Sequence, residues 1–218
     1  MKRLDQIPSR VQALWCQFLT INDTLTKWAR VSKCANEATK VPVAWRETVQ
    51  IDVSNWHWWL FETELKKLSC RCNVLIIHGG IKEVSTFVLK YIQPRDHLIV
   101  SGTHISALAI PKSVAILTFV GSSSWVDDTV EHISTLNIKD TSFLLEHLRS
   151  FPLLQTLYSD NCSAKLMGGV FRHLIPKSLK LISVRVPPEL LHGWRTIETW
   201  LKQNAPSVKV EIHVVLPS

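Results

Sequence analysis

Nine histidines and five cysteines are the side chains of this 218-residue sequence best suited to act as metal ligands, nucleophiles or acid–base groups. His78, His132 and His213 lie on or beside strand-like apolar segments, far apart and without a His-x-x-x-His spacing. Cys70-Arg71-Cys72 is spaced too tightly for a usual zinc knuckle, and no second Cys/His pair follows it. No cysteine has a nearby histidine and acidic residue that would activate it as a nucleophile. We therefore expect no metal, no cofactor and no catalytic residue.

The glycine and serine clusters lead to the same expectation. Neither Gly79-Gly80 nor Gly168-Gly169 is followed by the Lys-Ser/Thr of a phosphate-binding loop. The segment GSSSW at 121–125 lacks the Gly-x-Ser-x-Gly context of a serine hydrolase. The sequence predicts a protein that is not itself an enzyme.

Composition restricts the class of protein and of partner. Hydrophobic residues make up 46% and charged residues 20%, as in folded globular chains, and the length allows one large domain or two small ones. The net charge of +7 favours acidic partners, but the basic residues stand singly or in pairs such as Lys66-Lys67. A solvated basic surface is therefore favoured over a nucleic-acid-binding patch.

Cysteine usage and hydropathy indicate the compartment. Five cysteines are an odd number, which suits free thiols in a reducing environment. No apolar region follows the charged opening MKRLDQIPSR, and no apolar run is long enough to span a bilayer. We expect a cytoplasmic or nuclear protein, or one found in both, that makes no membrane contact.

Residues 4–52 have the periodicity of a small helical unit. A first helix is expected after Pro8, where apolar residues recur at intervals of three and four: Leu4, Ile7, Val11, Leu14, Trp15, Phe18 and Leu19. A second follows the cap residues Asn22 and Asp23, with Leu25, Trp28, Ala29, Val31 and Ser32. A third begins near Lys33 and ends before Pro42. Trp45, Val49 and Ile51 then lie on a segment expected to be extended or turn-like.

This series resembles the F-box, whose pattern is Leu-Pro, a helix ending in Phe-Leu, a leucine-rich helix, Val-Cys/Ser-Lys and a final Leu-Trp. The sequence departs from it at Ile7, Trp28 and Ala44. A unit this small cannot bury so many apolar side chains in its own core. In the F-box family another chain, Skp1, covers part of them. The resemblance implies Skp1 contact or support by Ile7, Pro8, Val11, Leu14, Trp15, Phe18, Leu25, Val31 and Trp45. An internal core position is the alternative for each.

Residues 73–218 contain strand-length apolar segments at regular intervals. Their equivalent residues are 23, 19, 19, 21, 25 and 28 positions apart, namely Leu75, Leu98, Leu117, Leu136, Leu157, Ile182 and Val210. The segments resemble leucine-rich repeats, with Thr103, Ser122, Thr141 and Cys162 at the usual Asn/Cys position. The resemblance implies about seven coils of strand plus convex helix. One such helix is expected around Phe143, Leu144, Leu148 and Phe151, capped by Thr141 and ended by Pro152.

The expected fold class is therefore α/β: a three-helix F-box over residues 4–52, a linker over 53–72, and a short curved solenoid with a parallel sheet over 73–218. The linker is rich in aromatic residues, and we expect Trp56, Trp58, Trp59 and Phe61 to cap the open end of the solenoid. A cage for an aromatic ligand is the alternative.

The resemblance implies the substrate-recognition adaptor of a Skp1–cullin–F-box ubiquitin ligase. Partners would be a Skp1-like adaptor, the cullin complex and an unidentified target protein. Candidate target contacts lie at strand positions between the anchor residues: His78, Ser101, Thr118, Asn137, Lys139, Tyr158, Ser183, Arg185 and Glu211. One alternative is an F-box scaffold outside any ligase, and another is a basic solenoid that binds RNA or DNA with a steep salt dependence.

Overall fold

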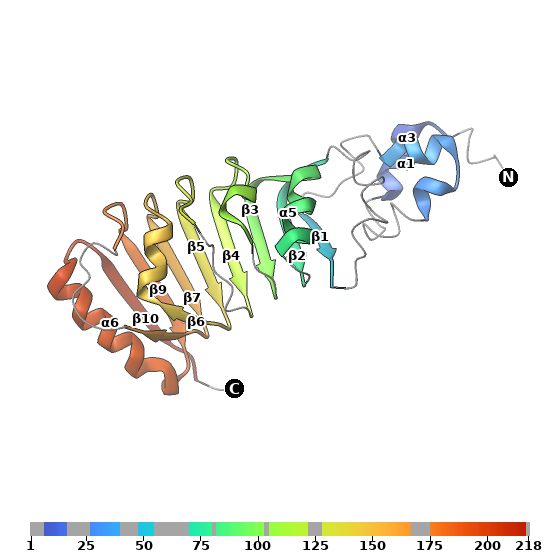
Figure 1. Cartoon of the computed structure of the whole chain (residues 1–218). Helices are drawn as coiled ribbons and strands as arrows, with labels where there is room; N and C mark the ends of the chain where they lie inside the picture. Colours follow the sequence, from blue (N-terminus) through green and yellow to red (C-terminus); the bar gives the residue numbers. More distant parts are fainter. Residues whose placement is uncertain are drawn as a thin grey trace.

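The computed structural model describes residues 7–16, 27–39, 48–54, 70–79, 82–102, 105–121, 128–166 and 175–216. Its main element is an eight-stranded sheet in which every pairing is parallel, in the order β1-β2-β3-β4-β5-β7-β9-β10 (Figure 1). The strands are Thr48–Asp52 (β1), Cys70–His78 (β2), Ile92–Ser101 (β3), Ile116–Val120 (β4), Thr135–Lys139 (β5), Thr156–Asp160 (β7), Leu181–Val186 (β9) and Lys209–Val214 (β10). Each strand pairs with the next sheet strand in the chain, so the class is α/β with one strand per coil.

The seven anchor residues predicted from spacing form one row across this sheet. Leu75 pairs with Leu98, and the pairing continues through Leu117, Leu136, Leu157, Ile182 and Val210. Val49 of β1 extends the row by one strand. The predicted register is therefore confirmed, and the sheet has one strand more than the seven expected.

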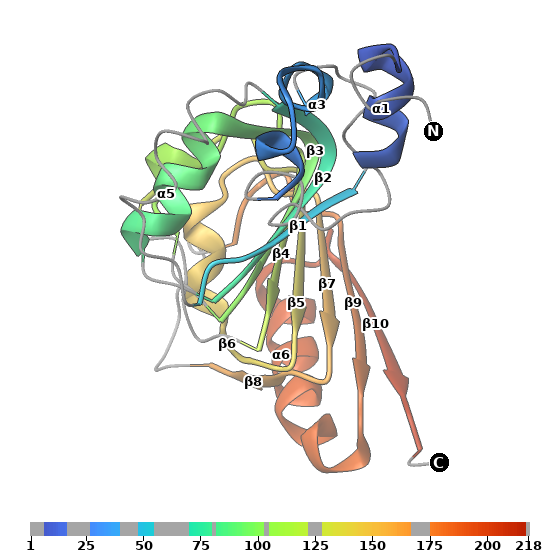
Figure 2. The same ribbon diagram turned by 90° about the vertical axis from the view of Figure 1, so that its right-hand side faces the viewer.

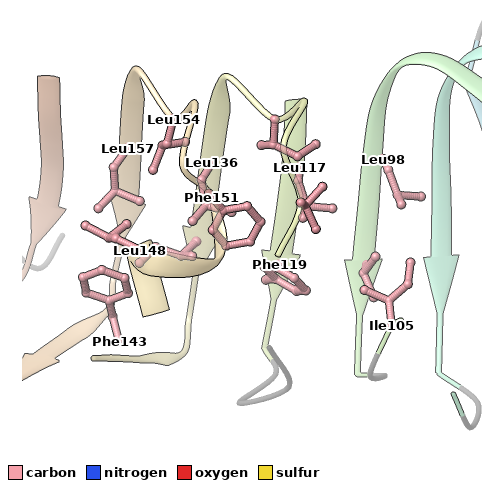
Figure 3. Close-up of a cluster of buried hydrophobic side chains, with 14 of the residues drawn as sticks. Leu98, Ile105, Leu117, Phe119, Leu136, Phe143, Leu148, Phe151, Leu154 and Leu157 are labelled. Atoms are coloured by element: carbon pink, nitrogen blue, oxygen red, sulfur yellow. The ribbon is translucent and has the colours of Figure 1, made fainter. Parts of the chain in front are cut away.

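The core lies between the sheet and the connections that return along one side of it (Figure 2). Strand side chains alternate between the two faces, so the anchor row and the row two residues further on both point inward. Leu98, Leu117, Phe119 and Leu136 are fully buried there, together with Leu148 and Phe151 from the connection after β5 (Figure 3).

Five successive coils turn at a residue in the left-handed backbone region. Gly79, Gly102, Gly121, Asp140 and Asn161 have φ values between 51° and 67°, a region that glycine, aspartate and asparagine enter more easily than other residues. The backbone N–H of each donates to a carbonyl of the next strand, as Gly79 does to Ser101 at 2.7 Å. The thiol of Cys162, one residue past this position, donates a hydrogen bond to the Asp160 carbonyl at 3.0 Å.

The connections differ from the convex helices that the sequence predicted. Only the coils of 23 and 28 residues contain α-helices among the described residues, Lys82–Tyr91 (α5) and Leu191–Asn204 (α6). The 19-residue coil between Leu98 and Leu117 contains the short 3-10 helix Ala107–Ala109 (η4), and the 21-residue coil contains Leu145–Ser150 (η5). A third 3-10 helix, Pro188–Leu190 (η7), precedes α6. An α-helix advances only about 1.5 Å per residue, so a short coil needs more extended backbone to cross the same sheet.

The prediction of a convex helix around Phe143 is therefore wrong. Residues Ser142–Leu144 form strand β6, which pairs in parallel with Ser163–Lys165 (β8) in a second, two-stranded sheet. The residue that precedes η5 is Leu144, so Thr141 does not cap it. The helix η5 ends at Ser150, two residues before Pro152.

Helix α6 closes the C-terminal end of the core. Trp194 is fully buried, its ring stacks on Phe143 with centroids 5.9 Å apart, and its indole N–H donates to the Cys162 carbonyl at 2.9 Å. Gly193 lets the helix approach β8, because a Cβ at this position would lie 2.6 Å from the Ala164 carbonyl oxygen.

The N-terminal unit begins as predicted with a helix after Pro8, Ser9–Cys16 (α1). The second expected helix is reduced, among the described residues, to a 3-10 turn over Trp28–Arg30 (η2), and the third is Lys33–Thr39 (α3). Ala13, Cys16 and Ala38 form a small core with Trp28 packed against it.

The expected domain boundaries also differ from the structure. Residues 48–52 are strand β1 of the large sheet, with Val49 and Ile51 in its core, so the segment assigned to the helical unit belongs to the solenoid. Strand β2 begins at Cys70, inside the expected linker. Trp56, Trp58, Trp59 and Phe61 lie outside the described residues.

Candidate functional site: the open face of the sheet

The face of the sheet opposite the core consists of three rows of side chains that cross all eight strands. The central row runs from Gln50 through Ile76, Ile99, Thr118, Asn137, Tyr158 and Ser183 to Glu211. A second row runs from Asp52 through His78, Ser101, Val120, Lys139, Asp160 and Arg185 to His213. The third row runs from Thr48 through Val74, His97, Ile116, Thr135, Thr156 and Leu181 to Lys209. All nine candidate target contacts lie in the first two of these rows, on the face opposite the core.

Apolar side chains predominate on the part of this open face over β2, β3 and β4. Five β-branched side chains point outward there and are partly exposed: Val74, Ile76, Ile99, Ile116 and Val120. Outward-facing strand positions on a solvated sheet are usually polar, so this half has the composition of a surface that another molecule covers. The sequence interpretation missed these residues, because it selected polar candidates only.

The part over β5, β7, β9 and β10 carries polar and charged groups. Lys139 and Arg185 are exposed on either side of the partly buried Asp160. Lys209 contacts Glu211 at 2.5 Å and lowers the pKa of that carboxyl mainly by hydrogen bonding. Tyr158, 46% exposed, supplies an aromatic surface in the central row. This half offers groups that can fix the orientation of a bound chain by hydrogen bonds and ion pairs.

A hydrogen-bonded trio lies where the two halves meet. Thr118 is only 3% exposed although it faces outward, because its neighbours cover it. Its hydroxyl accepts a hydrogen bond from the Asn137 amide at 3.0 Å and lies 2.7 Å from Nε2 of His97. Burial lowers the pKa of His97, so the ring is favoured in its neutral form. Three strands thereby hold the Asn137 amide in one orientation on the open face.

A second exposed apolar surface lies on the N-terminal unit. Val11, Trp15 and Val31 are 43%, 39% and 53% exposed, and Pro8 is exposed as well. Trp15 meets Trp28 edge-to-face with ring centroids 5.9 Å apart. Among the described residues of this unit, the buried apolar positions are held by smaller side chains: Ala13, Cys16, Ala35 and Ala38. Ile7 is partly buried, the Leu14 side chain is not described, and Phe18, Leu25 and Trp45 lie outside the described residues.

The histidines are dispersed. His78 ends β2, His213 lies on β10, and His132 lies in the turn just before β5, so each is on or beside a strand as expected. Burial lowers the pKa of His132 and of His147, whose Nδ1 accepts a hydrogen bond from the Leu144 N–H at 3.4 Å. Among the described residues, no group of three or more histidine, cysteine or acidic side chains is placed to hold a metal ion.

Comparison with known proteins identifies no relative: no protein-family model matches the chain, and no curated protein matches it significantly. In the part of the chain that the structure describes, no helix has the length and apolar character needed to cross a membrane.

Proposed function

We propose that this chain is an F-box and leucine-rich-repeat protein that acts as the substrate-recognition adaptor of a Skp1–cullin–F-box ubiquitin ligase. The N-terminal unit binds a Skp1-like adaptor, and the open face of the sheet binds a target protein. The chain makes and breaks no covalent bond. Its contribution to catalysis is proximity, because it holds the target near the ubiquitin-charged enzyme of the complex.

The observation that carries this proposal is the exposed apolar surface of the N-terminal unit. Among its described residues, this unit buries Ala13, Cys16, Ala35 and Ala38 and leaves two valines and a tryptophan at the surface. These three side chains are already about half buried, so covering the exposed remainder of one contributes about 1 kcal/mol, and a protein partner that covers all three gains part of the free energy of a stable interface.

The open face supports the second binding event. Its apolar half gives area that can be dehydrated on binding, and its polar half, from Asn137 to Glu211, gives directional contacts. We place the target across both halves. Val74, Ile76, Ile99, Ile116 and Val120 thereby join the nine polar candidates as contacts.

A co-purification experiment with the full chain tests the proposal. Wild-type protein is mixed with purified Skp1 and a cullin, and Val11→Asp and Val31→Asp are compared with Val215→Asp. Val215 is the matched control because it is 43% exposed, as Val11 is, but lies near the C-terminal end. Loss of Skp1 binding in the first two variants only, with an unchanged circular-dichroism spectrum, is the expected result.

Other outcomes have definite meanings. If wild-type protein does not bind Skp1, or if all three variants bind it equally, the adaptor proposal fails. If Skp1 binds but no cullin follows it into the complex, the chain is an F-box scaffold for assembly of other proteins outside the ligase.

A further inference from the structure

A groove on the core side of the sheet, away from the open face, lies between helix α5 and the 3-10 turn η4. It encloses about 850 Å³, and its apolar wall includes Phe87, Leu108 and Pro111. Phe87 is braced by an edge-to-face contact with Tyr91 at 5.0 Å between ring centroids. The groove is thus formed by two different connections and is separate from the three open-face rows.

The most exposed large hydrophobic side chain of the described residues stands in this groove. Leu108 is 91% exposed, whereas its neighbours Ala107 and Ile110 are 6% and 4% exposed. A 3-10 helix has three residues per turn, so burying positions 107 and 110 turns position 108 outward. The fold of the coil therefore exposes this leucine to solvent. Exposed apolar surface is unfavourable in free energy, and a bound partner that covers the leucine would remove that term.

The charged residues that line the groove, as far as the structure describes it, are all positive. Lys90 from α5 and Lys112 from the turn before β4 both line it and are exposed, and its described lining includes no acidic residue. Gln93 adds a neutral hydrogen-bonding group. Because this positive charge flanks an apolar surface, the complementary ligand combines an apolar side chain with carboxylates on either side.

We propose that the α5–η4 groove is a docking site for an acidic amphipathic peptide segment of a second protein. One aliphatic or aromatic side chain of the segment packs against Leu108 and Phe87, and its Asp or Glu residues pair with Lys90 and Lys112. The groove is open enough to leave Leu108 almost wholly exposed, which suits a peptide better than an enclosed small molecule. Docking here leaves the open face and the N-terminal unit free, so the site does not depend on the ubiquitin-ligase proposal.

Selection of peptides on the full-length chain tests this inference. The probe is a random dodecapeptide library displayed on phage, and the most enriched peptide is then synthesised with a fluorescent label for anisotropy titrations. We expect enriched sequences with an aliphatic or aromatic residue next to Asp or Glu. Leu108→Ala should weaken binding about tenfold or more, because the leucine loses the contact that buries it.

A charge-reversal variant tests the proposed ion pairs between the groove and the peptide. The double variant Lys90→Glu/Lys112→Glu should weaken binding at least as much, and added salt should strengthen the residual binding because it screens the new repulsion. The matched controls are Leu153→Ala, at a leucine 56% exposed, and Lys177→Glu/Lys180→Glu, at two exposed lysines in another coil. Both should bind as wild type does.

The inference is overturned if no peptide is enriched, if enriched peptides lack acidic residues, or if the groove variants and the controls bind alike. A single-stranded RNA that displaces the peptide and is itself lost in the lysine double variant would also overturn it, since the groove would then be a phosphate-binding surface.

Discussion

Replacing Thr118 by valine removes the hydroxyl at the centre of the open face and keeps the shape of the side chain. Thr118 is 3% exposed, and its oxygen contacts the Asn137 amide at 3.0 Å and His97 Nε2 at 2.7 Å. Valine is also a favourable strand residue, so the backbone of β4 has no reason to change. The variant therefore isolates the contribution of two hydrogen bonds.

The expected loss follows from the burial of the two partners. A hydrogen bond inside a protein contributes about 0.5–1.5 kcal/mol, so two lost bonds amount to about 1–3 kcal/mol. His97 and Asn137 are only partly buried, and water can replace the hydroxyl in part. We expect the free energy of unfolding to fall by about 1–2 kcal/mol, with a lower melting temperature.

Urea unfolding followed by tryptophan fluorescence measures this difference. The matched control is Thr135→Val, the same substitution at a partly exposed position of the neighbouring strand on the same face. Its effect should stay within about 0.5 kcal/mol. A Thr118→Val protein as stable as Thr135→Val would refute the reasoning that the hydroxyl joins the three strands.

Three further results are expected. Gly193→Ala should lower the free energy of unfolding in urea, since the new Cβ meets the Ala164 carbonyl at 2.6 Å; overpacking costs about 1–3 kcal/mol, which exceeds the gain of about 1 kcal/mol from better helix propensity. Ser159→Ala should raise that free energy by about 1 kcal/mol, because its hydroxyl is buried without a hydrogen-bond partner; an unchanged or lower value would contradict this. Stability should fall as the pH drops through and below the ordinary histidine pKa, because the unfolded chain binds more protons than a fold that lowers the pKa of three histidines; a flat profile from neutral to mildly acidic pH would contradict the burial of His97, His132 and His147.

The strand register was the most predictable feature of the fold. Each anchor residue lies in a segment rich in β-branched residues, and a regular spacing of such segments leaves few alternatives to one strand per coil. Strand β1 was not predicted, because the resemblance to the F-box assigned its residues to the helical unit, although Val49 and Ile51 show the same alternation as the strands of the repeats.

The connections were predictable only in part, because the choice between α-helix and extended backbone depends on a length that must be spanned. Phe143, Leu144, Leu148 and Phe151 have helical spacing, yet a 21-residue coil needs β6 and a 3-10 helix to cross the core. Three of these four residues, Phe143, Leu148 and Phe151, are buried all the same, whereas Leu144 is only partly buried and its neighbour Leu145 is buried. Periodicity therefore identified most of the buried residues but not the backbone that carries them.

The open face shows a further limit of binary patterning. In β2 the run Val74, Leu75, Ile76 and Ile77 is apolar on both faces, so alternation alone cannot separate inside from outside. Counting from the anchor Leu75 does separate them, because only every second residue shares its face, and this assigns Val74 and Ile76 to the outside. An outward position filled by valine or isoleucine is then informative because it opposes the usual pattern. We infer that the binding surface of this sheet is best sought over β2–β4, where the sequence is least polar, and not only among the polar residues over β5–β10.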